Sequence, residues 1–168
     1  MGVKGTMKST FAVPAGSPAV SLAGQWVELP MAPTVNHYYV TPLGKSNVRI
    51  LPREVKVYRR TVYYELRRLT KAPIAFIPPP LRVEIEMRFP TKARQDLDNR
   101  AKSCLDALRL AGMFEDDWQI DELLLRRGPI LPDKAGNKFF GGQFRVKVDT
   151  IDNITVEALY GPHPPERK

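Results

Sequence analysis

Hydrophobic positions recur with a helical period in two segments of this chain. After Pro52 the apolar positions are spaced by three and four residues, which predicts an amphipathic helix of four turns with Val55, Tyr58, Val62, Leu66 and Leu69 on its buried stripe. A second helix is expected from about Asp98 to Ala111, ended by Gly112. Its buried stripe would consist of Leu97, Ala101, Cys104, Leu105, Leu108 and Ala111.

Other segments alternate apolar and polar residues with the period of a strand. The clearest is "LRVEIEMRF" at 81–89, which would place five apolar side chains on one face. Strands are also expected within 25–30, 121–130, 141–150 and 153–161, and a long turn at 132–142. These elements predict a single α/β (α+β) domain over 25–160, with a flexible N-terminal extension (1–24) and a flexible tail (161–168).

Composition narrows the class of protein. A hydrophobic fraction of 43% fits a globular domain, and the formal net charge of +8 favours a polyanion as partner. The single Cys104 forms no intramolecular disulfide and no zinc motif, so a reducing cytoplasm is the default. No apolar run is long enough to cross a bilayer, which excludes membrane insertion. Residues 1–25 faintly resemble a signal peptide, but prolines and glycine interrupt its apolar core, which favours an extension.

Basic residues concentrate on the first helix. Four of them, Arg59, Arg60, Arg67 and Arg68, are candidate contacts to DNA phosphates, although a solvated helix face is the usual meaning of such a run. Lys45, in the preceding segment, is an alternative contact.

Carboxylates concentrate elsewhere, since eight of the eighteen acidic residues fall within Asp96 to Glu122. Asp96 or Asp98 has an ordinary alternative role as a helix N-cap, and Asp98 and Lys102 have the spacing of a helical ion pair. A second acidic group, "FEDDWQIDE", follows the helix. Because the helix would be roughly 20 Å long, the sequence does not say whether the acidic groups at its two ends lie close together. Crowded carboxylates are commonly neutralised by a divalent cation such as Mg²⁺. The charge pattern therefore indicates a metal-dependent enzyme acting on nucleic acid.

A calcium-binding EF-hand is excluded by the same residues. In "DLDNRAKSCLDA" Arg100 stands at loop position 5, Ala101 replaces the required glycine, and Ala107 replaces the terminal glutamate.

Together, "RQDLDNRAKSCLDAL", "AGMFEDDWQIDE" and "LLLRR" resemble the RusA-type Holliday junction resolvases. The shared pattern is Asp-x-Asp-Asn, a Lys four residues after the second Asp, Leu-Asp-Ala-Leu, and a glycine-containing turn before Asp-Asp. A looser similarity covers "VELPMAPTVNHYY", which includes Asn36 and Tyr38, and the likeness extends over about 25–160. The chain departs from the pattern in its N-terminal extension, its enlarged "LPDKAGNKFFGG" turn and His37.

The resemblance implies a fold, a site and an activity. The fold would be a small mixed sheet packed with two main helices, in a homodimer. The catalytic acids that hold Mg²⁺ would be Asp96, Asp98 and Asp117, and Mn²⁺ would substitute for Mg²⁺. Lys102 would be an essential neighbour and Asp116 an auxiliary ligand. Asn36 and Tyr38 would contact DNA.

The expected activity is paired, symmetric cleavage of four-way DNA junctions in recombination and repair, by a cytoplasmic protein encoded by a bacterium or a phage. A secreted basic protein would require cleavage near Ala23 in the signal-like start, and two further alternatives remain at this level. One is a metal-dependent nuclease acting on other branched DNA. The other is a nonenzymatic DNA-binding module, whose acids would only cap helices and solvate strand ends and whose DNA binding would not depend on Mg²⁺.

Overall fold

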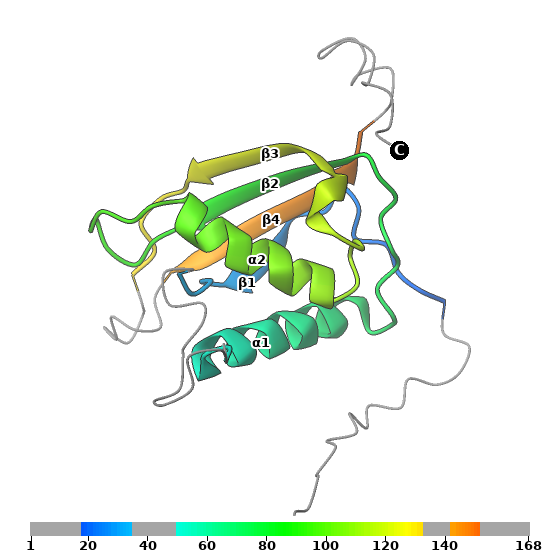
Figure 1. Ribbon diagram of the computed structural model, residues 1–168, viewed down its shortest axis with the longest axis horizontal. Helices are drawn as coiled ribbons and strands as arrows, with labels where there is room; N and C mark the ends of the chain where they lie inside the picture. Colours follow the sequence, from blue (N-terminus) through cyan, green and yellow to red (C-terminus); the bar gives the residue numbers. More distant parts are fainter. Residues whose placement is uncertain (1–17, 35–49, 133–141, 152–168) are drawn as a thin grey trace, which may run out of the picture.

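The computed structural model describes residues 18–34, 50–132 and 142–151, which form a sheet with two α-helices (Figure 1). In chain order the elements are β1 (Val27–Pro30), α1 (Arg53–Thr70), β2 (Leu81–Arg88), α2 (Asp98–Leu110), the 3-10 helix η2 (Asp117–Gln119), β3 (Ile120–Arg127) and β4 (Gln143–Thr150). The two helices and the strands over 25–30, 81–89, 121–130 and 141–150 are therefore confirmed, with ends that differ by a few residues.

The sheet is mixed, with the strand order β1-β4-β2-β3. β4 pairs antiparallel with both β1 and β2, whereas β2 and β3 are parallel. Parallel neighbours need a long crossover connection, and the segment that contains α2 and η2 supplies it. The acid-rich stretch of the sequence is thus the crossover of a β-α-β unit.

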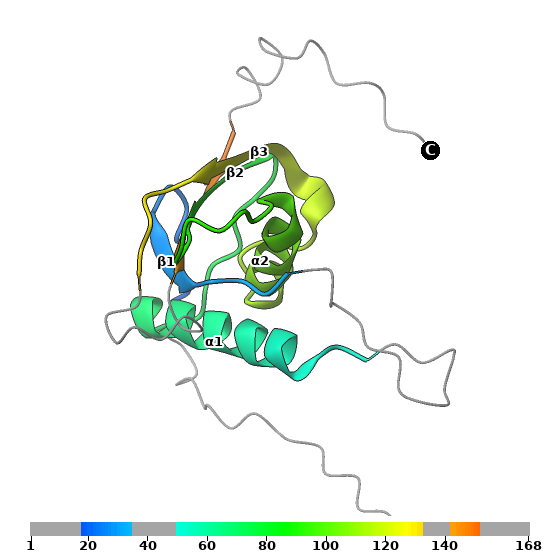
Figure 2. The ribbon, with the colours of Figure 1, turned by 90° about the vertical axis from the view of Figure 1, so that its left-hand side faces the viewer.

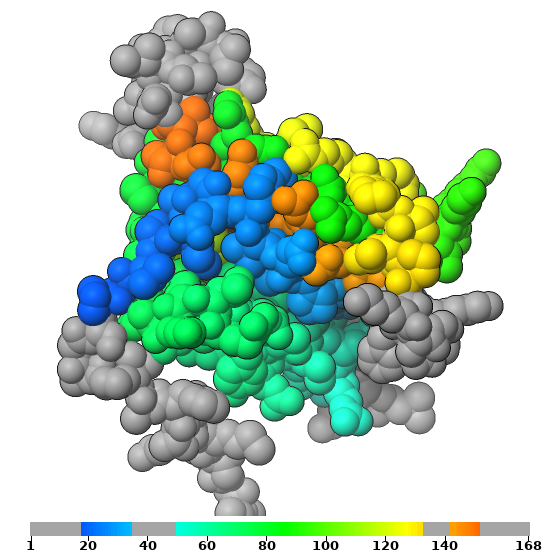
Figure 3. All heavy atoms as spheres, turned by 180° about the vertical axis from the view of Figure 1, so that it is seen from behind, coloured from blue at the N-terminus to red at the C-terminus, as the bar shows by residue number. Residues whose placement is uncertain are grey.

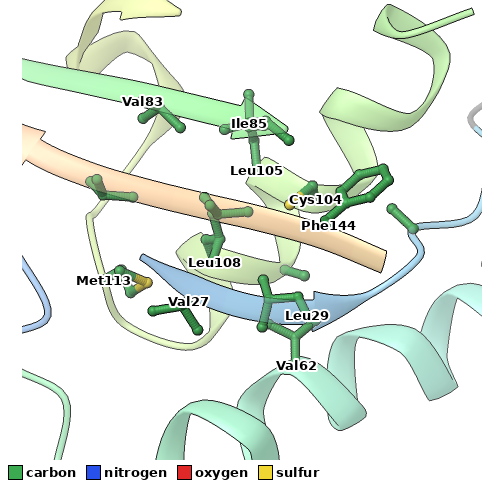
Figure 4. Packing of buried hydrophobic residues seen from close by; sticks show 14 of the residues in the cluster. Val27, Leu29, Val62, Val83, Ile85, Cys104, Leu105, Leu108, Met113 and Phe144 are labelled. Carbon is green, nitrogen blue, oxygen red and sulfur yellow. The ribbon is translucent and has the colours of Figure 1, made fainter. Parts of the chain in front are cut away.

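The core lies between one face of the sheet and the two helices. Leu81, Val83, Ile85 and Met87 of β2 are fully buried, as the period-two pattern predicts. α2 lies over this face, and α1 packs against β1 and α2 (Figures 1 and 2). Figure 4 shows side chains from the strands and both helices meeting in this cluster. On α1 the buried stripe ends at Leu66, because Leu69 in the last turn is 48% exposed.

The opposite face of the sheet carries charged side chains and is covered by neither α1 nor α2 (Figure 3). Glu84 and Glu86 of β2 form ion pairs with Arg126 of β3, and Lys147 of β4 pairs with Glu84. The Trp26 ring lies against the guanidinium of Arg126 at 5.2 Å. This face is therefore a network of ion pairs between neighbouring strands.

The packed region begins before residue 25, where the sequence places the start of the domain. Val20 forms a parallel bridge with Ile74, and Leu22 is buried in the core. An apolar side chain at Leu22 explains why this part of the segment packs. Residues 1–17, the tail over 161–168, the strand expected over 153–161 and most of the turn over 132–142 lie outside the described residues. Within the described residues, no helix has the length and apolar character needed to cross a membrane.

Candidate active site

A sharp reversal after α2 brings the second acidic group back toward the first. Gly112 has φ +89°, a left-handed conformation that glycine adopts without strain. The amide of Met113 donates to the carbonyl of Leu108 at 3.2 Å, and Met113 and Phe114 are buried in the core. The chain after α2 therefore runs back beside the helix and is held there by apolar burial. This reversal brings Asp117 into contact with Lys102, in the first half of α2.

Within the returning segment, Asp116 and Gln119 form a capping box around η2. The Asp116 carboxylate accepts a hydrogen bond of 2.8 Å from the amide of Asp117. The Gln119 side chain, which is buried, accepts from the amides of Glu115 at 2.9 Å and of Asp116 at 3.2 Å. Asp116 thus has a structural role as a cap. Gln119 is a functional position that its residue type alone does not reveal, although Asp followed three residues later by Gln is a recognisable capping signal.

The Asp117 carboxylate accepts instead from the ammonium of Lys102 on α2. Lys102 also forms an ion pair of 3.3 Å with Asp106, one turn further along α2. Asp106 in turn accepts from Arg59 of α1 at 3.2 Å. The side chains of Arg59 and Asp106 are largely buried, whereas Lys102 is half-exposed. A chain of alternating charges therefore runs from α1 through α2 to η2 and ends at the surface.

Both members of the surface pair are held in their charged forms. The hydrogen bond from the Lys102 ammonium lowers the pKa of Asp117 to about 2 from an ordinary value of 3.8, and a smaller lowering comes from hydrogen bonding with the Asp116 side chain. Reciprocally, the Asp117 carboxylate raises the pKa of Lys102. At neutral pH the site therefore presents one carboxylate and one ammonium group in direct contact.

Asp96 and Asp98 lie at the start of α2. Leu97 occupies the N-cap position and provides no side-chain cap, and Asp96 accepts from the Asn99 side chain at 3.2 Å. Asp98 is the first residue of α2, where the helix dipole stabilises a carboxylate. The helical ion pair between Asp98 and Lys102 does not form in the described residues, because Lys102 reaches toward Asp106 and Asp117.

The connection that leads into α2 is held by two arginines. Arg100 of α2 donates to the Gln95 side chain at 3.0 Å and to the carbonyl of Ala32, while Arg127 of β3 donates to the carbonyl of Gln95. Burial lowers the pKa of Arg100. These contacts fix the residue that precedes Asp96 and tie the segment after β1 to the same end of α2. Gln95 carries no signal of this role in the sequence.

The donor chemistry of the three aspartates suits Mg²⁺, a hard cation that prefers oxygen ligands and usually binds through one or two carboxylates together with phosphate and water. Among residues 18–34, 50–132 and 142–151, however, no three acidic, histidine or cysteine side chains are grouped closely enough to hold one metal ion. The structure brings Asp117 to Lys102, with Asp98 one helical turn before Lys102. The complete set of Asp96, Asp98 and Asp117 around an ion stays a prediction.

The candidate DNA contacts on α1 differ in exposure. Arg60 is exposed and Arg67 is partly buried. Arg68 is 72% exposed and pairs with Glu65 at 2.9 Å, while Arg59 is directed inward to Asp106. The other three candidates, Asn36, Tyr38 and Lys45, lie outside the described residues.

Cys104 is fully buried, and burial raises the pKa of its thiol to about 12. A thiol in this state is a poor nucleophile, which confirms its assignment to the core.

Comparison with known proteins identifies the family of the chain. Residues 28–150 match the family model described as endodeoxyribonuclease RusA. The crossover junction endodeoxyribonuclease RusA of Enterobacteria phage HK97 is 30% identical over 126 residues, which cover 75% of this chain and 94% of the relative. The proteins of the same name from Escherichia coli K12 and from Enterobacteria phage 82 are 32% and 31% identical over 106 residues, covering 62% of this chain and 82% of each relative. The matched region extends from the second residue of β1 to the end of β4, and the chain belongs to the RusA endodeoxyribonuclease family.

Proposed function

We propose that this protein is a Mg²⁺-dependent endodeoxyribonuclease that resolves four-way DNA junctions by paired, symmetric hydrolysis of phosphodiester bonds. The observation that carries the proposal is the exposed ion pair between Lys102 and Asp117, in a chain of the RusA family. Relatives with 30% and 32% identity are named crossover junction endodeoxyribonucleases, which favours the junction over other branched DNA as substrate.

The chemistry requires an activated water, neutralisation of the charge that develops on the phosphate, and help for the leaving oxygen. Mg²⁺ held by Asp96, Asp98 and Asp117 would supply a Lewis acid and a more acidic bound water. Mn²⁺ would substitute for Mg²⁺. Because its pKa is lowered to about 2, Asp117 is ionised at every pH at which the enzyme would work.

Lys102 has two properties that suit it to a phosphate. Its pKa is raised, so the ammonium is protonated, and its side chain is 51% exposed, so the charge faces solvent. Asp106 holds the ammonium from the buried side, which orients it before substrate arrives. We assign Lys102 the stabilisation of negative charge on the scissile phosphate, a role that a preorganised cation performs well.

DNA would be held by the basic surface, in keeping with the formal net charge of +8. On α1 the exposed Arg60 and Arg68 are placed for phosphate contacts, whereas the inward contact of Arg59 with Asp106 supports a packing role. The proposed DNA contacts also include Asn36, Tyr38, Lys45 and Arg67.

The proposed substrate also bears on assembly and location. A four-way junction needs two symmetric cuts, and a two-fold homodimer with two active sites matches that symmetry. The bacterial and phage sources of the relatives fit a protein that acts on DNA in the bacterial cytoplasm.

The experiment that tests this function compares substrates. Purified protein is incubated with a synthetic four-way junction, a flap and a linear duplex of equal length, each with Mg²⁺ or with EDTA. The proposal predicts cleavage of the junction into nicked duplexes in Mg²⁺ and none in EDTA. Preferential cutting of the flap would support the nuclease for other branched DNA. Metal-independent binding without cutting in Mg²⁺ or Mn²⁺ would support the nonenzymatic module.

A further inference from the structure

β3 is the edge strand of the sheet, and among the described residues it pairs only with β2. It is eight residues long, and it exposes apolar side chains on both faces, with Leu123 45% and Leu124 49% exposed. A long apolar edge strand is a template for pairing with another strand, and proteins usually protect such edges. Within the part of the chain that the structure describes, this edge is therefore open to a partner strand.

The backbone of β3 is directed so that it can accept a partner strand. The amide of Gly128, just after the strand, donates to the carbonyl of Met87 in β2 at 2.9 Å. Because backbone groups of successive strand residues point to opposite sides, the even-numbered residues of β3 from Glu122 onward, where the register is regular, face β2. The N–H and C=O groups of Leu123 and Leu125 consequently point away from the sheet.

The sequence of this edge is complementary to itself when it is reversed. Residues 121–127 read "DELLLRR", with two acids before three leucines and two arginines after them. We propose that β3 pairs antiparallel with β3 of a second copy, about a two-fold axis at Leu124, and so joins the two sheets into one. The inference rests on the proposed homodimer and names its interface.

This register satisfies the side chains. Leu124 lies opposite its own counterpart, and Leu123 lies opposite the partner's Leu125. Glu122, which pairs with Arg82 of its own chain, faces the partner's Arg126, and Asp121, at the irregular start of the β2–β3 register, comes opposite the partner's Arg127. Opposite charges facing each other across strands are stabilising and like charges are destabilising. Parallel pairing in register would set arginine against arginine, and a shift of the antiparallel register by one pair would set charges against leucines.

The register also agrees with the backbone. Leu123 and the partner's Leu125 both present outward N–H and C=O groups, so they form a hydrogen-bonded pair of the antiparallel ladder. Leu124 then falls on a non-hydrogen-bonded pair, where opposed side chains are closest. The backbone therefore permits the register that the side chains select.

The two-fold axis of such a pair is perpendicular to the joined sheet. Both copies of α2 therefore lie on the same side of it, and so do both pairs of Lys102 and Asp117. This places two equivalent candidate sites on one surface, as two cuts in one junction require.

Cross-linking at the axis tests the register. A Leu124→Cys substitution would set two thiols opposite each other, with Cβ atoms about 4.5 Å apart, near the separation in a disulfide. Mild oxidation should then produce a covalent dimer of the full chain. The native Cys104 is fully buried and should not compete. The matched control is Leu110→Cys on α2, because Leu110 is similarly exposed, at 52%, and lies outside β3. It should cross-link little.

Charged substitutions at Leu124, on the proposed two-fold axis, test the same contact in solution. The mass of each variant is measured by light scattering after size-exclusion chromatography. Leu124→Lys and Leu124→Glu should each be monomeric at concentrations at which the unmodified protein is dimeric, while Leu110→Lys stays dimeric. An equimolar mixture of the Leu124→Lys and Leu124→Glu proteins should restore a dimer, because lysine then faces glutamate. Circular dichroism checks that each variant is folded.

The outcomes separate the interface from the function. A monomeric unmodified protein would overturn the homodimer and this interface together, whereas junction cleavage is measured independently. A dimer that persists in both Leu124 charge variants, or a mixture that stays monomeric, would overturn the β3 interface and leave a homodimer by another surface.

Discussion

Replacing Asp117 by asparagine should separate catalysis from stability. The substitution keeps the size of the side chain but removes the charge that pairs with Lys102. The two side chains are 39% and 51% exposed, and an ion pair this exposed contributes only about 0–1 kcal/mol to stability. The capping contact should survive, because it uses the amide of residue 117 and the carboxylate of Asp116. We therefore expect Asp117→Asn to lower the free energy of unfolding by no more than about 1 kcal/mol.

The effect on cleavage should be far larger. Metal coordination of a phosphoryl oxygen contributes several kcal/mol to transition-state stabilisation, and each 1.36 kcal/mol is tenfold in rate. Losing about 3 kcal/mol through a missing ligand corresponds to a decrease of roughly 100-fold or more in the single-turnover rate of junction cleavage. Junction affinity in EDTA should be unchanged or increased, since a negative charge near phosphate has been removed.

The assay combines urea unfolding, junction binding in EDTA and single-turnover cleavage in Mg²⁺. Glu115→Gln is the matched control, because it removes one exposed carboxylate two residues away, and its cleavage rate should stay within a few-fold of the unmodified protein. The reasoning is refuted if Asp117→Asn cuts at nearly the unmodified rate, or if Glu115→Gln loses as much activity.

The remaining predictions concern single charged side chains. Lys102→Met should return the pKa of Asp117 from about 2 toward its ordinary 3.8, measured by NMR titration of the carboxyl carbon; an unchanged pKa would show that another group sets it. Since the pKa of Asp117 is lowered in the folded state, its contribution to stability is present above pH 3.8 and is lost as pH falls toward about 2, by at most about 1 kcal/mol. Urea unfolding between pH 6 and pH 2 should show this loss in the unmodified protein, and a smaller loss in Lys102→Met. Arg59→Ala should destabilise the fold by about 1–3 kcal/mol through its partner Asp106, while Arg60→Ala should change stability by less than about 0.5 kcal/mol. If Arg60 contacts a phosphate, its loss should make the slope of log K against log salt shallower by roughly 0.9; an unchanged slope assigns it to solvent.

The helices and most strands could be predicted because their periodicity reflects burial on one face. β2 alternates strictly, and its apolar residues are all buried. In the edge strand β3, apolar residues are less often buried than in β2. Its three consecutive leucines are partly or largely exposed. The strand was expected, but its position at the edge of the sheet depends on tertiary pairing, which the pattern does not specify.

The site could be predicted as a set of residue types but not as a set of contacts. Lys102 and Asp117 were expected to belong together through the resemblance, while their contact depends on the reversal at Gly112 and the burial of Phe114. The sequence suggested Asp98 as the partner of Lys102, because four-residue spacing on a helix favours such a pair. The long lysine side chain instead reaches two other carboxylates, Asp106 and Asp117. A spacing rule identifies neighbours along a helix, but not the competing partner that tertiary structure brings in.

The proposed function makes the charged pair on α2 and η2 part of a metal-dependent junction nuclease. Its most direct measurement follows the unmodified protein on a four-way junction labelled on each strand in turn, with Mg²⁺ added to complexes assembled in EDTA. The account predicts that bound junction is stable in EDTA and that Mg²⁺ starts cleavage at symmetric positions in two opposed strands. Intact junction after the addition of Mg²⁺ or Mn²⁺, with the protein still bound, would contradict it.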